Sequence, residues 1–271
     1  MSGSFEQVFD EWTSLVQRER EMQHRVQASG HAGASSSSSL TENSHQDRSS
    51  DRIFHSCPTE LRVEICEWCF RVVDHCNIDR DVVGIALSYF DRYLSSQTST
   101  KQSLMKLVGM TSLYLAAKWH STRKISVSNM SSLSHGHFQV DQILNMESCI
   151  IKALNFHLNP PTPFIYLNVA CPLIGDSAEK EARYLIELSV CDDYFMDKKP
   201  SCVAYAAILV AMDLLAIPRK RFPGHGLKHS PIERELCIQR LHQLNSLTSP
   251  EMEEEGVSPS TRECPSPTTV I

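Results

Sequence analysis

The sequence predicts an all-α protein: a five-helix bundle followed by a partial second helical bundle. Two observations carry this prediction. Apolar residues recur at helical spacing along most of residues 57–247, and no strand-type alternation persists. The segment from Lys101 to Trp119 is apolar nearly all round, which is typical of a helix buried among other helices. We therefore expect this segment to form the centre of the first bundle.

Residues 1–28 precede the bundle and predict an amphipathic helix. Phe5, Phe9, Trp12 and Leu15 recur near the helical period, with charged residues between them. Residues 29–56 then lose their apolar positions and include a run of five serines. This composition indicates a Ser-rich, flexible linker.

The first bundle is expected over residues 57–160. Its first helix starts after Pro58, and either Asp79 or Asp81 is placed to cap the second helix, which ends near Leu94. The remaining helices are expected over residues 101–119, 127–133 and 140–154. Prolines at positions 160, 161 and 163 then break the helical pattern and mark a boundary.

The second bundle is expected over residues 161–247. Helical patterns cover residues 164–169, 179–190, 201–215 and 232–247, which is fewer helices than the first bundle has. We therefore describe the second bundle as partial. Residues 248–271 are rich in proline, serine and acidic residues, a composition typical of a disordered tail.

Composition excludes some classes of protein. The net charge is −6, whereas proteins that read nucleic acid usually carry a basic face, so we expect no nucleic-acid partner. No apolar run approaches the ~18 residues of a membrane span, and the first residues do not resemble a signal peptide. We expect a protein of the nucleus, the cytoplasm or both, whose ten cysteines are mostly free thiols.

A zinc site is one alternative for the cysteines. Cys66 and Cys69 form a CxxC pair, with Cys57, His75 and Cys76 nearby. A structural zinc site needs four convergent ligands, yet this pair lies within an expected helix and no second CxxC follows at zinc-like spacing. We expect these thiols to pack in the core, with no bound metal.

A hydrolase is a second alternative, and the sequence offers little for it. It contains no GxSxG, P-loop or HExxH string, and its 12 histidines are scattered. We expect neither catalysis nor a cofactor.

Four strings identify the first bundle more closely. They are LRVEICEW from Leu61, YFDRYLSS from Tyr89, LVGMTSLYLAAKW from Leu107, and ILNMESCIIKALNFHLNPPTP from Ile143. In this order and spacing they resemble the cyclin box, the N-terminal domain of cyclins, over about residues 58–163. Residues 178–215 resemble the start of the second cyclin fold more loosely. The resemblance implies a regulatory subunit that binds and activates a cyclin-dependent serine/threonine protein kinase, in cell-cycle control.

The resemblance also assigns roles to individual residues. Lys118 and Glu147 match the lysine and glutamate that bond to the kinase backbone near its mobile αC helix. A charged donor and a charged acceptor suit that task, because charge-assisted hydrogen bonds are about twice as strong as neutral ones. Arg62 and Asp91 match a structural ion pair that joins the first two helices.

The substrate-docking groove departs from the family pattern. Trp68 matches the groove tryptophan, and Leu61 and Ile65 match its apolar neighbours. Glu64 stands where the family is usually apolar, and Lys106 stands where glutamine is common. Both charges would alter the docking of substrates or inhibitors through this groove. Residues 119–121 also lack the acidic pair of many cell-cycle cyclins, which leaves the identity of the kinase open.

The tail offers three candidate phosphorylation sites. Ser249, Ser258 and Ser266 each precede a proline, the minimal target of proline-directed kinases, and with the acidic cluster the tail resembles the degradation segments of short-lived cyclins. An inert solvated tail would have the same composition. The alternatives for the whole chain are a cyclin-fold regulator of transcription or nutrient signalling, and an interaction scaffold that binds no kinase.

Overall fold

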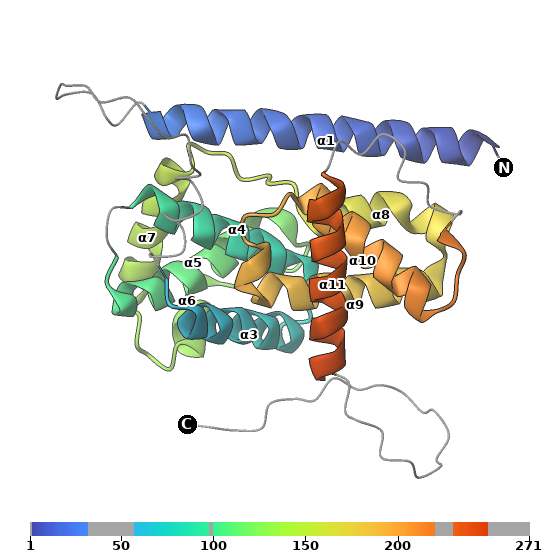
Figure 1. The fold of residues 1–271 in the computed structure, drawn as a ribbon. Coiled ribbons are helices and arrows are strands. Elements are labelled where there is room, and N and C mark those ends of the chain that lie inside the picture. The colour runs from blue at the N-terminus through green and yellow to red at the C-terminus, as the bar shows by residue number, and fades with distance from the viewer. Residues whose placement is uncertain (1, 32–56, 98–99, 220–229, 249–271) are drawn as a thin grey trace, which may run out of the picture.

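The computed structural model describes residues 2–31, 57–97, 100–219 and 230–248. These residues contain helices and no strand, so the all-α prediction is confirmed. Figure 1 shows two helical bundles side by side, with the long helix α1 (Ser2–His31) lying across both of them.

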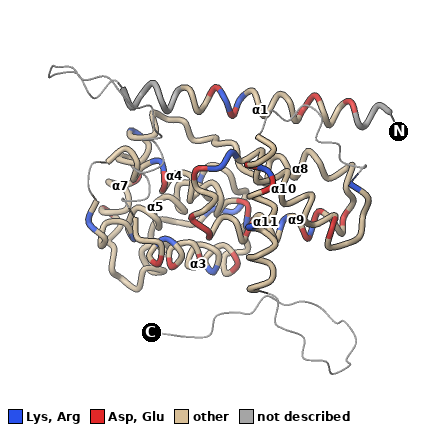
Figure 2. The backbone as a smooth tube through the Cα atoms, viewed as in Figure 1, with Lys and Arg blue, Asp and Glu red and all other residues tan. Residues whose placement is uncertain are grey.

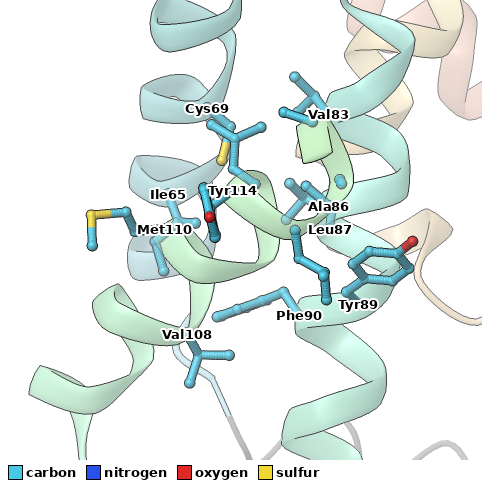
Figure 3. Close-up of a cluster of buried hydrophobic side chains, with 14 of the residues drawn as sticks. Ile65, Cys69, Val83, Ala86, Leu87, Tyr89, Phe90, Val108, Met110 and Tyr114 are labelled. Atoms are coloured by element: carbon cyan, nitrogen blue, oxygen red, sulfur yellow. The ribbon is translucent and has the colours of Figure 1, made fainter. Parts of the chain in front are cut away.

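The first bundle is formed by α3 (Thr59–His75), α4 (Asp81–Ser96), α5 (Gln102–His120), α6 (Val127–Leu133) and α7 (Val140–Ala153). As predicted, α5 is the central helix: every residue from Leu107 to Ala117 is buried. Side chains of α3, α4 and α5 meet in one apolar cluster, in which Ile65, Phe90 and Val108 are prominent (Figure 3).

Gly109 sets how closely α3 approaches α5. A Cβ atom at this position would lie 2.5 Å from Cγ2 of Ile65, closer than real Cβ contacts allow. The absence of a side chain therefore lets Ile65 pack directly against the α5 backbone. This contact fixes the position of α3 relative to the central helix.

The second bundle is formed by α8 (Pro163–Ile174), α9 (Asp176–Cys191), the short 3₁₀ helix η1 (Asp193–Phe195), α10 (Pro200–Leu214) and α11 (Pro231–Thr248). Its central helix is α10, in which every residue from Ser201 to Met212 is buried. Helix α8 runs five residues beyond the predicted end at Val169, because Pro172 lies inside its last turn and does not end it.

The predicted cap of α4 is wrong. Arg80 occupies the N-cap position and no side chain caps the helix. Asp81 instead accepts a hydrogen bond from Arg183 of α9 at 2.5 Å, so its carboxylate joins the two bundles. Arg80 likewise pairs with Glu187 of α9. The start of α4 is therefore part of the contact between bundles.

Helix α1 packs against the second bundle. The rings of Trp12 and Tyr166 lie 5.0 Å apart, and Val8 and Leu15 are buried beside them. The Tyr166 hydroxyl donates to Oε2 of Glu19 at 2.6 Å, and Glu19 is itself only 2% exposed. Burial, and then the Glu19 carboxylate, raise the pKa of Tyr166. This polar contact fixes the register of α1 on α8.

Two further findings bear on the class of protein. Among the described residues, none of the helices combines the length and the apolarity needed to span a bilayer. All nine cysteines in this part of the chain are free thiols, five of them half-buried or exposed.

Candidate functional site

Lys118 and Glu147 meet on the surface of the first bundle. Lys118 lies in the last turn of α5 and Glu147 in the middle of α7, and the Lys118 Nζ donates to Glu147 Oε1 at 2.9 Å. The side chain of Lys118 is 50% exposed, whereas that of Glu147 is 9% exposed. The two residues that the resemblance assigns to one surface therefore form one ion pair.

The ammonium of Lys118 is held in place and keeps part of its capacity to donate. Its Nζ lies 5.6 Å from the centre of the Tyr114 ring, an attractive contact for a cation. The hydrogen bond to Glu147 and the charge of that carboxylate raise the pKa of Lys118, although partial burial opposes them. Because an ammonium has three donors, one bond to Glu147 leaves others for a partner.

The end of α5 is anchored by polar contacts on both sides. The Lys124 ammonium donates to the carbonyl oxygens of Lys118 and Ser121, which satisfies carbonyls left over at the helix end. The Nε2 of His120 lies 2.7 Å from the carbonyl oxygen of Leu158, and the Tyr89 hydroxyl donates to the same oxygen. Lys118 is therefore presented by a fixed backbone.

Large apolar side chains are exposed on the same elements. Trp119 follows Lys118 and is 61% exposed, while Leu144 lies one turn before Glu147 and is 39% exposed. Phe156, in the turn after α7, is 75% exposed and has a φ of 60°, a conformation that bulky residues rarely adopt. Exposed large apolar side chains are typical of a surface that binds another protein.

Sequence reasoning singled out Trp119 but missed Leu144 and Phe156. Leu144 falls on the apolar pattern of an amphipathic helix, and nothing in that pattern separates it from core residues. Phe156 stands in a turn whose backbone conformation the sequence does not reveal. The one signal available in the sequence was that Phe156 is an apolar residue that follows the predicted end of the helix at residue 154.

Arg62 and Asp91 join α3 to α4, as the resemblance assigns them. The Arg62 guanidinium donates to both carboxylate oxygens of Asp91, at 3.2 and 2.9 Å, and to the carbonyl oxygen of Val190 at 2.9 Å. Burial opposes the charge of Arg62, but the Asp91 carboxylate outweighs it and raises the pKa of the guanidinium. Arg62 thus ties α3 to α4 and also to the second bundle.

The residues of the expected docking groove occupy two different environments. Leu61 and Ile65 are 3% and 5% exposed and belong to the core. Glu64 and Lys106 lie on the surface and form an ion pair of 2.6 Å between α3 and α5. The two charged residues that depart from the family pattern therefore neutralise each other. Trp68 is half-buried and lines a cavity of about 400 Å³ with Leu133 and His135.

Two remaining predictions concern the tail and metal ions. Ser249, Ser258 and Ser266 lie outside the described residues. In the part of the chain that the structure describes, no three His, Cys, Asp or Glu side chains converge as metal ligands would. Acidic and basic residues are interspersed along α3 (Figure 2).

Comparison with known proteins places both bundles in one family. Residues 35–159 match the family model of the cyclin N-terminal domain, and residues 161–257 match that of the cyclin C-terminal domain. The chain is 29% identical over 185 residues to G2/mitotic-specific cyclin-B2 of Oryzias luzonensis, covering 65% of this chain and 48% of the relative. It is 27% identical over 206 residues to Cyclin-A1-2 of Arabidopsis thaliana, covering 72% and 46%. The chain thus spans about half the length of these relatives.

Solved structures show the same fold at low sequence identity. A viral cyclin from herpesvirus saimiri superposes with a TM-score of 0.58 at 14% identity, covering 70% of this chain and 86% of the viral one. A chain of the CAK complex of Chaetomium thermophilum, bound to ATP-γ-S, gives 0.53 at 17% identity, covering 89% and 76%. Because the two cyclin domain models together match most of the sequence, in order and in step with the two bundles, the chain belongs to the cyclin family.

Proposed function

We propose that this chain is the regulatory subunit of a cyclin-dependent serine/threonine protein kinase, which it binds and activates. The observation that carries the proposal is the Lys118–Glu147 pair, whose two residues match, by resemblance, the lysine and glutamate with which cyclins contact their kinase. Exposed apolar residues lie on the same elements. Membership of the cyclin family supports it. A further structural neighbour, with a TM-score of 0.50 at 11% identity, is a chain of the yeast RNA Pol II CTD kinase complex.

The mechanism follows from what a kinase requires. Phosphoryl transfer is efficient only when the kinase's own Lys–Glu pair is formed, and this depends on the position of its αC helix. In the proposed complex, Lys118 and Glu147 bond to the kinase backbone beside αC, while Trp119, Leu144 and Phe156 supply apolar contact area. The chain holds αC inward, and catalysis belongs to the kinase.

The internal ion pair suits this task because it positions Lys118 before binding. A free lysine side chain loses conformational entropy when a partner immobilises it, at a cost of about 0.5–1.5 kcal/mol. Glu147, the nearby Tyr114 ring and the anchored end of α5 already restrict Lys118. Less entropy therefore remains to be lost on binding.

A role in cell-cycle control is the finer part of the proposal. Its support is that the relatives include G2/mitotic-specific cyclin-B2 from Oryzias luzonensis and Rana japonica. The chain matches only part of each relative, so the role rests on similarity within the two cyclin domains. Depletion of the protein in dividing cells is expected to change the distribution of cells among phases, measured as DNA content by flow cytometry. An unchanged distribution would count against this part alone.

The kinase-binding proposal is tested by affinity purification of the tagged chain from cells, with partners identified by mass spectrometry. We expect a cyclin-dependent kinase with the wild-type chain and strongly reduced recovery with Lys118→Glu or Glu147→Lys. Lys180→Glu, which changes an exposed lysine of α9, is the matched control and should leave recovery unchanged.

The exchange variant Lys118→Glu/Glu147→Lys separates folding from binding. It restores an internal ion pair between α5 and α7 but reverses both charges that face the kinase. We expect this variant to fold like wild type, by circular dichroism, and still to recover little kinase. Full recovery of kinase with the exchange variant would refute the assignment of these residues.

A further inference from the structure

Two cysteines of different bundles meet beside Arg62. Cys66 of α3 and Cys191, the last residue of α9, have sulfur atoms 2.7 Å apart, and both are free thiols. Cys66 is fully buried, whereas Cys191 is partly exposed. The Cys191 sulfur is therefore accessible to solvent, whereas the Cys66 sulfur is not, although the two sulfurs are in contact.

The surroundings of the pair favour a thiolate at the exposed position. The hydrogen bond from Cys66 lowers the pKa of Cys191, and the Arg62 guanidinium lowers it further, although partial burial opposes both. Arg62 bonds to the carbonyl of Val190, the residue before Cys191, which fixes the end of α9 at this place. The pKa of Cys66 is raised by its bond to Cys191 and by burial, so Cys66 keeps its proton.

We propose that Cys66 and Cys191 form a reversible disulfide between the two bundles under peroxide, with Cys191 as the attacking thiol and Cys66 as the resolving thiol. The two sulfur atoms need to approach by well under 1 Å to reach the ~2.05 Å of a disulfide bond. Within the described residues, this sulfur–sulfur contact links α3 of the first bundle to α9 of the second.

The chemistry balances with hydrogen peroxide as the oxidant. The Cys191 thiolate attacks one peroxide oxygen, the O–O bond breaks, and hydroxide leaves and takes up a proton to form water. Cys191 is then a sulfenic acid. The Cys66 sulfur attacks the Cys191 sulfur, the S–O bond breaks, and the proton of Cys66 leaves with the hydroxyl as a second water. Two thiols are oxidised to one disulfide, and a dithiol reductant reverses the reaction by exchange.

The bond would connect α3, which carries Glu64 and Trp68, covalently to the second bundle. It closes a loop from position 66 to position 191, and disulfides that close long loops restrict the unfolded chain most. The oxidised form should therefore resist thermal unfolding more than the reduced form. The bundles are already joined here by Arg62, so the disulfide fixes an existing arrangement.

A second thiol pair offers an internal comparison. Cys202 of α10 and Cys237 of α11 interact with each other, which raises the pKa of Cys202, and both are fully buried within the second bundle. Peroxide has no direct access to either sulfur. We expect this pair to stay reduced at peroxide concentrations that oxidise Cys191, because oxidation follows exposure as well as thiolate character.

The test is peptide mapping of the full chain after exposure to hydrogen peroxide, blocking with N-ethylmaleimide and digestion with trypsin. We expect residues 63–71, with Cys69 alkylated, and residues 184–198 to be recovered as one linked pair. The pair should be lighter by two hydrogens than the same two peptides with Cys66 and Cys191 as free thiols. Dithiothreitol should release both. Recovery of Cys191 fully alkylated by N-ethylmaleimide, or as sulfinic acid without a link, would overturn the proposal.

Variants assign the link to its cysteines, since Cys69 falls in the same tryptic peptide as Cys66. Cys69→Ala should keep the linked pair, and Cys66→Ala should lose it. A link that survives Cys66→Ala would assign the bond to Cys69 and contradict the proposal. The wild-type chain supplies a further test that needs no variant. Its midpoint of thermal unfolding should rise on oxidation and return to the reduced value after dithiothreitol is added. An unchanged midpoint in fully cross-linked protein would contradict the proposed join between bundles.

Discussion

Replacing Arg62 by alanine tests the join between α3, α4 and the second bundle. The substitution removes three hydrogen bonds of the guanidinium, two to Asp91 and one to the carbonyl of Val190. The Arg62 side chain is 6% exposed and that of Asp91 20% exposed. The variant therefore leaves a partly buried carboxylate and a backbone carbonyl without their donor.

The magnitude follows from these environments. Removing one partner of a buried ion pair costs about 3–5 kcal/mol. Because Asp91 is partly exposed, water solvates it in the variant, which places the loss near the lower end, about 3 kcal/mol. The unpaired carbonyl of Val190 adds about 1 kcal/mol. We expect the free energy of unfolding to fall by about 4 kcal/mol.

Urea unfolding followed by circular dichroism measures this loss. Arg71→Ala is the matched control, because Arg71 is exposed on the same helix and its replacement should change stability by no more than about 0.5 kcal/mol. The double variant Arg62→Ala/Asp91→Ala removes both charges and should recover part of the loss. A loss below about 1 kcal/mol, or one equal to that of Arg71→Ala, would refute this account of Arg62.

Three further predictions concern packing, a surface pair and pH. Gly109→Ala should destabilise the fold by about 1–3 kcal/mol in urea unfolding, because the new Cβ would meet Ile65 at 2.5 Å; wild-type stability would contradict the packing of α3 on α5. Lys106→Ala should cost less than about 1 kcal/mol, since both members of its pair with Glu64 are about half exposed; a larger loss would show that the pair supports the fold. Burial, helped by the nearby Asp81 carboxylate, raises the pKa of Glu187 despite its pairing with Arg80. The folded state therefore binds this proton more tightly, and the contribution of Glu187 to stability falls as pH rises through the range just above 4.5. In Glu187→Gln this fall should be absent from the unfolding free energy measured against pH; identical pH profiles would contradict it.

The position of a helix in the bundle could be predicted where its apolar pattern shows how much of the helix is buried. The apolar stretch of α5 indicated a helix surrounded by others, and α5 is the central helix of the first bundle. Helix α8 extends beyond the predicted end at Val169 to Ile174, and it includes Pro172 in its last turn, where a missing N–H removes only one bond of the helix. The cap of α4 was misread because the partner of Asp81 is Arg183, about a hundred residues along the chain.

In the candidate site, too, the sequence identified individual residues but not the contacts between them. The residue types of Lys118 and Glu147 came from family-like strings, but their mutual ion pair depends on how α5 and α7 pack. Glu64 and Lys106 were recognised as unusual, whereas their neutralising contact needed the structure. Contacts between residues distant in sequence depend on tertiary packing and are not carried by local periodicity. The thiol pair of Cys66 and Cys191 belongs to this class as well.

The most direct test of the central claim is activation of the kinase that co-purifies with this chain. Phosphate transfer by that kinase is measured with no addition, with the wild-type chain and with the exchange variant Lys118→Glu/Glu147→Lys. Hydrogen bonds to charged groups contribute about 1.5–3 kcal/mol each, so the exchange should weaken half-maximal activation by more than about tenfold. Strong activation by the wild-type chain alone is the predicted result. Equal activation by the exchange variant, or none by wild type, would contradict the claim that this surface binds and activates a kinase.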